Sequence, residues 1–159
     1  MASVRDTGAT TPNLRGVEVS VRQRVAVALL SGSDVLLIHR WRDGNEYLVV
    51  PGGGVESGET VEEAARRELH EEVGVDLETP LTPLIDFEGF DELHGIRQRF
   101  IAFTGDAPTR QVRMSPAAPE ALKASASNRY ELEWIPLAAL ALLDVRPPEV
   151  KIALLALTR

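Results

Sequence analysis

The sequence predicts one α/β domain in which helices cover both faces of a mixed β-sheet. Three observations lead to this fold class. Apolar runs of strand length come first, a well-marked amphipathic helix follows at 60–73, and further strand-like runs precede two apolar helical segments near the C-terminus. This order of strands, one helix, strands and then helices is typical of a sheet that needs helices on each face to bury it.

Length and composition are those of one globular domain. The 159 residues are 44% hydrophobic and 26% charged, which supplies enough apolar material for one core. Residues 1–16 are polar, and we expect a mobile N-terminal tail there and a single domain over residues 17–159. Since the chain has no cysteine, any metal must bind oxygen or imidazole ligands.

Charge and hydropathy argue against several kinds of partner. The net charge is −7, which argues against duplex nucleic acid because such binding depends on cationic contacts to phosphates. No apolar run approaches the roughly 20 residues that span a bilayer, and the N-terminal residues lack an apolar signal core. We therefore expect no membrane partner and a cytoplasmic location.

Three or four strands are predicted before the helix, because residues 17–30 can form one strand or two. Residues 17–30 alternate and then become continuously apolar, and the turn that follows joins them to a second apolar run at 35–41. A short strand at 46–50 comes next. Pro51 ends it, because proline cannot donate to a β-ladder, and a glycine loop at 52–58 leads to the helix.

The helix has clear signals at both ends. Thr60 is a favourable N-cap, and Glu63 three residues later completes a capping box. Gly74 ends the helix as a C-terminal cap. Apolar residues at four-residue spacing predict its buried face: Val61, Ala65, Leu69 and Val73.

The second half of the chain predicts more strands and then helices. Residues 81–90 and 95–105 form two strands joined by a tight connection, and 129–137 form another. Between them, residues 105–128 are rich in Ala, Pro and Ser and predict a long loop. The last two segments predict helices, at 137–144 and 148–157.

Three carboxylates near the end of the predicted helix are unfavourably placed unless they have a partner. At 100° per residue, Glu68, Glu71 and Glu72 fall within an arc of roughly 100°. Glu68 and Glu72 are a like-charged i,i+4 pair, which costs about 0.2–0.5 kcal/mol. A solvated acidic face is the simpler interpretation, and a bound divalent cation is the one that we favour.

Residues 51–75 closely resemble the Nudix box. That pattern is glycine, five residues, glutamate, seven residues, arginine and glutamate, an aliphatic residue, any residue, two glutamates, any residue, glycine and an aliphatic residue. Gly53, Glu59 and the run from Arg67 to Val75 match every fixed position. Nine defined positions over 23 residues make this far more specific than a glycine loop alone.

The resemblance implies a fold, a reaction and a cofactor. The fold is the Nudix-type α/β/α sandwich with a mixed sheet. The reaction is hydrolysis of a small-molecule nucleoside diphosphate linked to another moiety, with Mg²⁺ or Mn²⁺ as cofactor. Dimerisation is common in this family, so a homodimer stays open. The alternative is a non-catalytic Nudix domain that senses a nucleotide ligand, although such modules usually lose box carboxylates that this chain keeps.

The resemblance also implies roles for the residues of the box. Glu68 and Glu72 are expected to bind the metal directly, Glu71 directly or through water, and Gly53 through its backbone carbonyl. Arg67 is expected to orient the box carboxylates. Glu68, Glu71 and Arg67 are therefore the predicted catalytic residues.

Two roles stay open at this point. Glu59 either anchors the glycine loop or binds a further metal. The general base is predicted to be Glu68, and acids outside the box are the alternatives: Glu131, Glu120, Asp91 and Glu92.

Substrate-binding residues are harder to predict. Arg97 and Arg99 alternate on one predicted strand and Arg40 lies on another, so each could meet phosphates; a solvated sheet edge is the simpler interpretation. Trp41 and Tyr47 could stack on a base, or one of them could only be packing. The downstream signatures of ADP-ribose, dinucleoside polyphosphate and NADH hydrolases are absent. This disfavours those substrates and leaves nucleoside triphosphates, including oxidised ones, and nucleotide sugars.

Overall fold

The computed structural model describes residues 21–91, 94–116 and 118–158, so the expected tail over residues 1–16 lies outside the described part. The helices and strands are, in chain order, β1 (Arg22–Ser31), β2 (Asp34–Arg42), β3 (Asn45–Val49), β4 (Gly52–Gly54), α1 (Val61–Val73), β5 (Thr82–Asp91), β6 (Ile96–Asp106), α2 (Pro119–Leu122), β7 (Asn128–Pro136), the 3₁₀ helix η2 (Leu137–Leu142), β8 (Val145–Arg146) and α3 (Pro148–Ala156).

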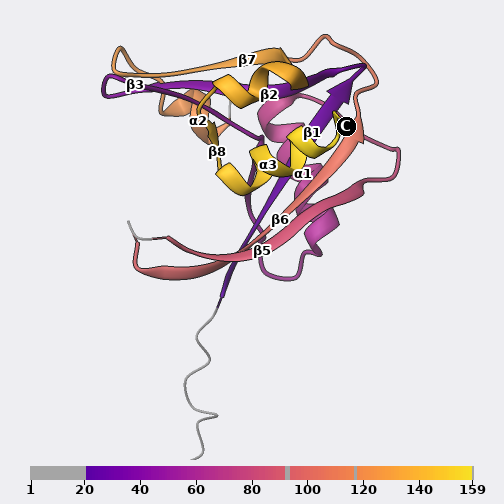
Figure 1. Cartoon of the computed structure of the whole chain (residues 1–159). Helices are drawn as coiled ribbons and strands as arrows, with labels where there is room; N and C mark the ends of the chain where they lie inside the picture. The colour runs from indigo at the N-terminus through magenta and orange to yellow at the C-terminus, as the bar shows by residue number, and fades with distance from the viewer. Residues whose placement is uncertain (1–20, 92–93, 117, 159) are drawn as a thin grey trace, which may run out of the picture.

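The strands form one mixed sheet (Figure 1). Its order is β5-β6-β1-β2-β3-β8, with β4 also paired to β1 and β7 to β2. The β1–β6 and β3–β8 pairs are parallel and the other pairs are antiparallel. No helix of the described residues is both long enough and apolar enough to cross a membrane.

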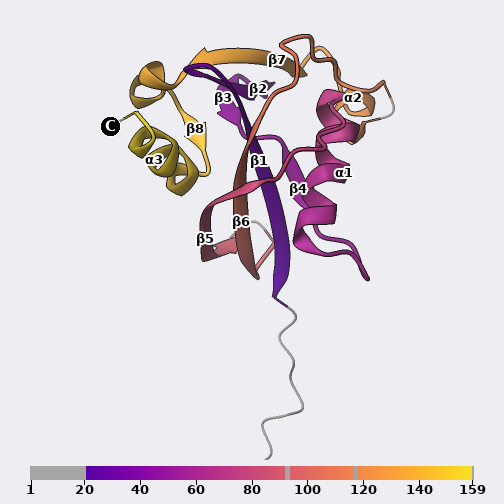
Figure 2. The same cartoon turned by 90° about the vertical axis from the view of Figure 1, so that its right-hand side faces the viewer.

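Helices cover the sheet from two sides, as Figure 2 shows, with α1 on one side and α3 on the other. The buried residues divide in the same way. Leu69 and Val73 of α1 pack with Val25, Val27 and Leu29 of β1. On the other side, Leu140 of η2 and Val150 and Leu154 of α3 pack with Ala26, Ala28, Val35 and Leu37. The predicted α/β/α sandwich is confirmed.

The first hairpin opens away from its turn. β1 and β2 pair only at Leu30–Val35 and Ser31–Asp34. Beyond these two pairs, β4 takes the place of β2 along β1, at residues 24–26. β3 takes the place of β1 along β2, at residues 38–42. The chain thus passes from one arm of the opened hairpin to the other between β3 and β4, and it does so where the Nudix box begins.

The ends of α1 are as predicted. The Thr60 hydroxyl accepts from the Glu63 N–H at 3.1 Å, and the Glu63 carboxylate accepts from the Thr60 N–H at 2.8 Å. Gly74 adopts φ 68°, and its N–H donates to carbonyls of the last turn, a conformation that glycine reaches without a Cβ penalty. The capping box therefore sets the first residue of the helix that carries the carboxylates.

Four parts of the fold differ from the sequence prediction. The helix α2 lies within residues 105–128, which were predicted as a loop, and its single turn is too short to show a period. Residues 52–54 were predicted as loop but form β4, because they pair with β1. Residues 137–142 form a 3₁₀ helix instead of the predicted α-helix; Leu137 and Leu140 are both buried, and i,i+3 residues share one side of a 3₁₀ helix. The two-residue strand β8 was not predicted, since so short a segment has no period to detect.

Candidate active site

β4 consists of glycine because its neighbours leave no room for side chains at two positions. A Cβ at Gly52 would lie 2.0 Å from the carbonyl oxygen of Val25, and a Cβ at Gly53 would lie 2.3 Å from Oε1 of Glu68. A Cβ at Gly54 would have nothing within 4 Å. Gly52 thus permits the close approach of β4 to β1, and Gly53 brings the backbone directly against a box carboxylate.

Glu72, in the last turn of α1, is a buried charged residue beside Gly52. It is 3% exposed, and its Oε2 accepts from the backbone N–H of Gly52 at 2.9 Å. A buried carboxylate is costly unless it is hydrogen-bonded. This contact therefore ties the last turn of α1 to β4.

Arg67 connects the other acids of the box. Its Nε and Nη2 donate to the two carboxylate oxygens of Glu59, each at 2.8 Å. Its Nη1 donates to Glu68 Oε1 at 2.9 Å and to Glu71 Oε2 at 3.4 Å, and its Nη2 donates to the carbonyl of Gly54 at 3.0 Å. All the nitrogens of the guanidinium are in use, which fits the expected orienting role.

Glu59 and Arg67 stabilise the charged form of each other. The hydrogen bonds from Arg67, together with the Glu56 N–H, lower the pKa of Glu59 to about 2. Glu59, and then Glu68, raise the pKa of Arg67 above its ordinary value. Because both Glu59 oxygens accept from Arg67 and one also accepts from Glu56 at 2.8 Å, the contacts favour the loop-anchoring interpretation of Glu59.

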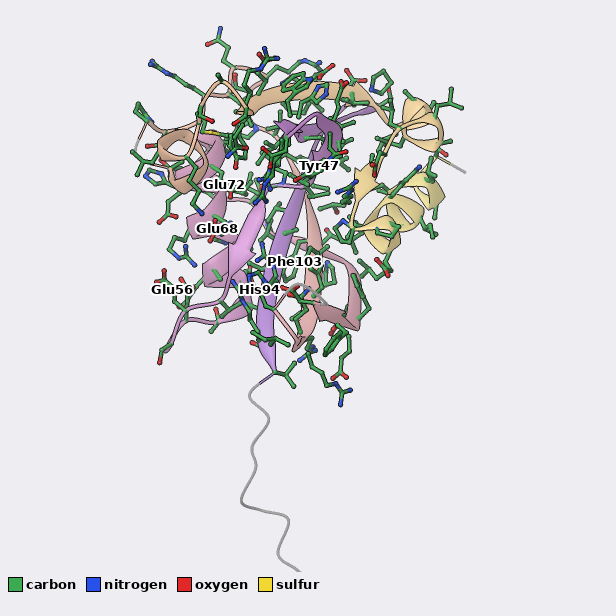
Figure 3. All side chains as sticks on the ribbon, turned by 90° about the vertical axis from the view of Figure 1, so that its left-hand side faces the viewer. Tyr47, Glu56, Glu68, Glu72, His94 and Phe103 are labelled. Carbon is green, nitrogen blue, oxygen red and sulfur yellow. The ribbon has the colours of Figure 1, made fainter. Side chains whose placement is uncertain are left out.

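The donor set of the box fits a hard divalent cation. Figure 3 shows Glu68 and Glu72 on the same helix, with Glu56 in the loop before it. The Glu68 side chain is 12% exposed and that of Glu71 42%, so one carboxylate is enclosed and the other faces solvent. Carboxylate and carbonyl oxygens are the ligands that Mg²⁺ prefers, and the absence of a Cβ at Gly53 leaves its backbone next to Glu68. The described residues nonetheless contain no group of three or more such side chains already gathered around one point, since Arg67 and the Gly52 amide hold the carboxylates.

A cavity of about 220 Å³ opens beside the box, where β1 and β2 separate. Gly52 and Glu72 are among the residues that line it. The others are Arg24, Val25, Ala26, Ile38, Arg40, Val49, Val50, Phe100, Tyr130, Arg146 and Pro147. The cavity therefore joins a box carboxylate to a lining that carries three guanidinium groups.

Two of these arginines belong to a stack with tyrosines. Arg40 lies opposite both Tyr47 and Tyr130 in the strand register, and its Nη2 donates to the Tyr130 hydroxyl at 2.8 Å. Its guanidinium carbon lies 4.7 Å from the ring centroid of Tyr130, and that of Arg146 lies 4.0 Å from the ring centroid of Tyr47. Cation–π contacts of this kind hold planar groups in fixed orientations. These contacts favour the packing interpretation of Tyr47.

The third lining arginine, Arg24, is half-buried on β1. It lies between Gly54 of β4 and Phe100 of β6 in the register. Burial lowers the pKa of Arg24, and Arg22 adds to this effect, while Glu72 and Glu68 oppose it. Arg24 is thus a cation of the cavity lining whose neighbour on β4 belongs to the box.

Of the residues predicted to bind substrate, the structure places Arg40 in the cavity and the other three elsewhere. Arg97 pairs with Glu88 at 3.1 Å and Arg99 pairs with Asp86, both across β5 and outside the cavity lining. Trp41 stacks on His39 with ring centroids 3.8 Å apart and also lies outside the lining.

Of the alternative general bases, the structure describes Glu131 and Asp91, and neither is part of the cavity lining. Glu131 is exposed on β7 and does not line the cavity. Asp91 lies 2.7 Å from a ring nitrogen of His94 at the end of β5. Glu92 and the side chain of Glu120 lie outside the described residues.

Sequence reasoning missed Arg24, Tyr130 and Arg146 as cavity residues. Arg24 and Tyr130 come from strands far apart in the sequence, and Arg146 comes from the unpredicted strand β8. Periodicity assigns a residue to one face of its own strand, but it does not show which strands separate. A prediction of where β1 and β2 stop pairing would have been needed to find these three residues.

This fold, with a glycine strand and an arginine-linked set of glutamates at one end of a cavity, is that of a Nudix domain. The family model of the NUDIX domain matches residues 21–155, and the chain belongs to this family. It is a Nudix hydrolase. A structure with 26% sequence identity and a TM-score of 0.61 is the MutT NUDIX hydrolase from Burkholderia pseudomallei, in a match that covers 84% of this chain and 95% of that one.

Curated relatives are similar over part of the chain. The RNA pyrophosphohydrolase of Rhodospirillum rubrum is 27% identical over 121 residues, which cover 69% of this chain and 73% of that protein. The RNA pyrophosphohydrolase of Wolbachia pipientis is 41% identical over 59 residues, 37% of this chain and 36% of that protein. The NUDIX domain of Shewanella oneidensis NrtR, solved with ADP ribose, has 15% identity and a TM-score of 0.64, which is a likeness of fold alone.

Proposed function

We propose that this Nudix hydrolase is a pyrophosphohydrolase that uses Mg²⁺ or Mn²⁺ to cleave the diphosphate linkage of a small nucleoside diphosphate derivative. The observation that carries the proposal is the contact of the Gly53 backbone with the Glu68 carboxylate, which Arg67 holds in place. The nearby cavity provides space for the nucleoside portion.

The residues of the box would have separate roles, some in binding the cation and others in orienting its ligands. Glu68, Glu72 and the Gly53 carbonyl would hold the cation, with Glu71 beside them. Held there, the cation would supply charge neutralisation for the diphosphate and would make the attacking water more acidic. This matters because the anionic oxygens of a phosphate repel nucleophiles and make the uncatalysed reaction very slow.

Glu68 is our choice of general base for water attack at phosphorus. Its carboxylate is enclosed and oriented by Arg67, whereas Glu131 is exposed and outside the cavity lining. General base catalysis needs such a positioned group within reach of the water. The water gives its proton to Glu68 as the new P–O bond forms, and the bond from phosphorus to the bridging oxygen breaks to release the leaving phosphate.

The cavity lining favours a substrate with an aromatic base and several negative charges. Arg40, Arg146 and Tyr130 line the cavity with planar groups on which a base can stack, and the positive charge of the lining attracts phosphate. Nucleoside triphosphates and nucleotide sugars are the leading substrates, and ADP-ribose is less favoured. RNA belongs in the same comparison, because the 5′ end of an RNA is where it can carry a phosphoanhydride and two relatives are RNA pyrophosphohydrolases.

A substrate panel tests the proposal. The chain is incubated with each candidate and Mg²⁺, Mn²⁺ or EDTA, and the products are separated by anion-exchange chromatography. We expect turnover with either metal and none with EDTA. Tight binding of one candidate without turnover of any would instead indicate a nucleotide sensor.

Substitutions test the assigned roles. We expect Glu68→Gln to lower kcat by about 10²–10⁴-fold, the range for loss of a general base. Glu62→Gln is the matched control, because Glu62 is on the same helix but pairs with Arg66 at its surface. A comparable loss in Glu131→Gln, with Glu68→Gln active, would reassign the base.

A further inference from the structure

The cavity lining has more positive than negative side chains. Arg24, Arg40 and Arg146 line it, against the single carboxylate of Glu72. Arg146 is paired with Asp144 at 2.9 Å, and Arg40 donates to Tyr130 and lies near two tyrosine rings. Arg146 and Arg40 thus have close partners, although the buried Nε of Arg40 has none among the described residues.

Arg24 differs from the other two. Within the described part of the chain, no hydrogen bond or ion pair of its guanidinium is found, and Glu72, Glu68 and Asp91 act on it as charges at longer range. A half-buried cation in this situation has lost part of its hydration without a close anion in return. A ligand anion would supply that partner, and charge-assisted bonds from arginine to phosphate are among the strongest in proteins.

The position of Arg24 indicates which part of a substrate it meets. It is the register neighbour of Gly54, directly after the Gly53 that contacts Glu68, and it lines the same cavity as Gly52 and Glu72. A ligand group in contact with Arg24 therefore lies on the cavity side of the diphosphate at the box. The nearest covalently linked anion at that place is the next phosphate of the chain.

We infer that Arg24 binds a third phosphate and selects substrates with three consecutive phosphates over nucleoside diphosphates joined to a neutral sugar. The inference rests on the proposed function. A nucleotide sugar brings two phosphates, both to the box, and leaves Arg24 without an anion. A nucleoside triphosphate and the 5′-triphosphate end of an RNA share the required chemistry.

The experiment compares Arg24→Gln with the wild type on three substrates: a nucleoside triphosphate, a short 5′-triphosphorylated RNA and a nucleotide sugar. kcat/KM is measured at saturating Mg²⁺, and calorimetry measures the Kd of a non-hydrolysable imido triphosphate. We expect the variant to lose about 10–100-fold on triphosphates, in kcat/KM and in Kd, as for a lost hydrogen bond to a charged group. The nucleotide sugar should change little, and Arg24→Lys should restore part of the loss.

Arg110→Gln is the matched control, because it also removes one positive charge but from a residue that pairs with Asp34 outside the cavity. The comparison of kcat/KM on the two triphosphates identifies whether a free nucleotide or an RNA 5′ end is the better substrate. If Arg24→Gln is poorly folded, the same comparison with Arg24→Lys, which keeps the charge but not the paired donors, decides the question.

Several results would overturn the inference. Equal losses on the sugar and on triphosphates would give Arg24 no selective role, and so would a wild type that turns over only nucleotide sugars. If the wild type turns over nothing, the proposed function fails. Binding then tests the phosphate contact by itself: weaker binding of the imido triphosphate to Arg24→Gln alone would support it, and equal Kd values for Arg24→Gln and Arg110→Gln would overturn it.

Discussion

At the scale of single residues, substitutions at Gly53 and Gly54 distinguish the effect of a steric clash from the effect of reduced backbone flexibility. A Cβ at Gly53 would meet the Glu68 carboxylate at 2.3 Å, whereas one at Gly54 would meet nothing within 4 Å. We expect Gly53→Ala to reduce kcat/KM by about 100-fold or more, because a displacement of about 1 Å in a catalytic group has such effects. Steady-state kinetics on the preferred substrate measure this loss.

Gly54→Ala is the control for that prediction. The two variants make the same chemical change one residue apart, and the Gly54 carbonyl that accepts from Arg67 is retained. Gly54→Ala should keep near wild-type activity. Similar losses in both variants would show that backbone flexibility, and not the space beside Glu68, sets the requirement for glycine.

Glu59 predicts a particular dependence of stability on pH. Arg67 lowers the pKa of Glu59 to about 2 from an ordinary value of 4.5, so the folded state holds this proton less tightly than the unfolded state. The stabilisation by Glu59 is therefore complete above about pH 4.5 and is lost as the pH falls through 2. Urea unfolding of the wild type and Glu59→Gln, from pH 7 to pH 2, measures the difference.

In that comparison the two proteins should differ in free energy of unfolding at pH 7 and converge in acid. Glu62→Gln gives the background for loss of an exposed acid on the same helix. A wild-type advantage over Glu59→Gln that stays constant down to pH 2 would contradict the prediction.

The contrast between Arg67 and Arg24 shows what a sequence can predict about single residues. The contacts of Arg67 fall within 13 residues along the chain, so the box pattern was sufficient to predict that Arg67 lies beside the box carboxylates. Arg24 lies beside the box only because β1 pairs with β4 and separates from β2. That is a long-range property, and a local pattern in one strand does not contain it.

At the scale of elements, the N-terminus of α1 gives a prediction about stability. Thr60→Ala removes the hydroxyl that accepts from the Glu63 N–H and should cost about 1 kcal/mol in free energy of unfolding, the usual effect of losing such a cap. Thr60→Ser keeps the acceptor and should stay close to the wild type. Urea denaturation monitored by circular dichroism compares the three proteins.

The elements also show where prediction from sequence succeeded. α1 has a cap, a period and a glycine stop, and all three were confirmed. β4 was wrong because a partner decides it: these residues form a strand since β1 lies beside them. η2 was wrong in helix type, because the spacing of the buried Leu137 and Leu140 fits an α-helix as well as a 3₁₀ helix. Local propensity is a weak guide in such short segments.

At the scale of the whole molecule, the sheet has a separate cluster of buried residues on each face. Leu69 belongs to the cluster under α1 and Leu154 to the cluster under α3, and each is at most 1% exposed. Leu69→Ala and Leu154→Ala should each lower the free energy of unfolding by about 2–5 kcal/mol. Tryptophan fluorescence and circular dichroism should report the same single transition in both variants, as for one cooperative domain.

Two transitions in either variant would show that the faces unfold separately and would contradict a single domain. The fluorescence signal is suited to this test, because Trp134 packs against the cluster under α1 whereas circular dichroism reports all the helices. An exposed change on α3, Ile152→Ala, is the control, since Ile152 is 68% exposed.

The opened hairpin has a consequence for how this enzyme could diversify. Arg24 is on one arm, while Arg40, Tyr130 and Arg146 belong to strands of the other arm, and the box joins the two. Because β3 and β4 occupy the edges that the arms would otherwise share, side chains across the opening are free of cross-strand pairing with each other. Substitutions on one arm would therefore change the lining of the cavity without disturbing the packing of α1, which carries the box glutamates.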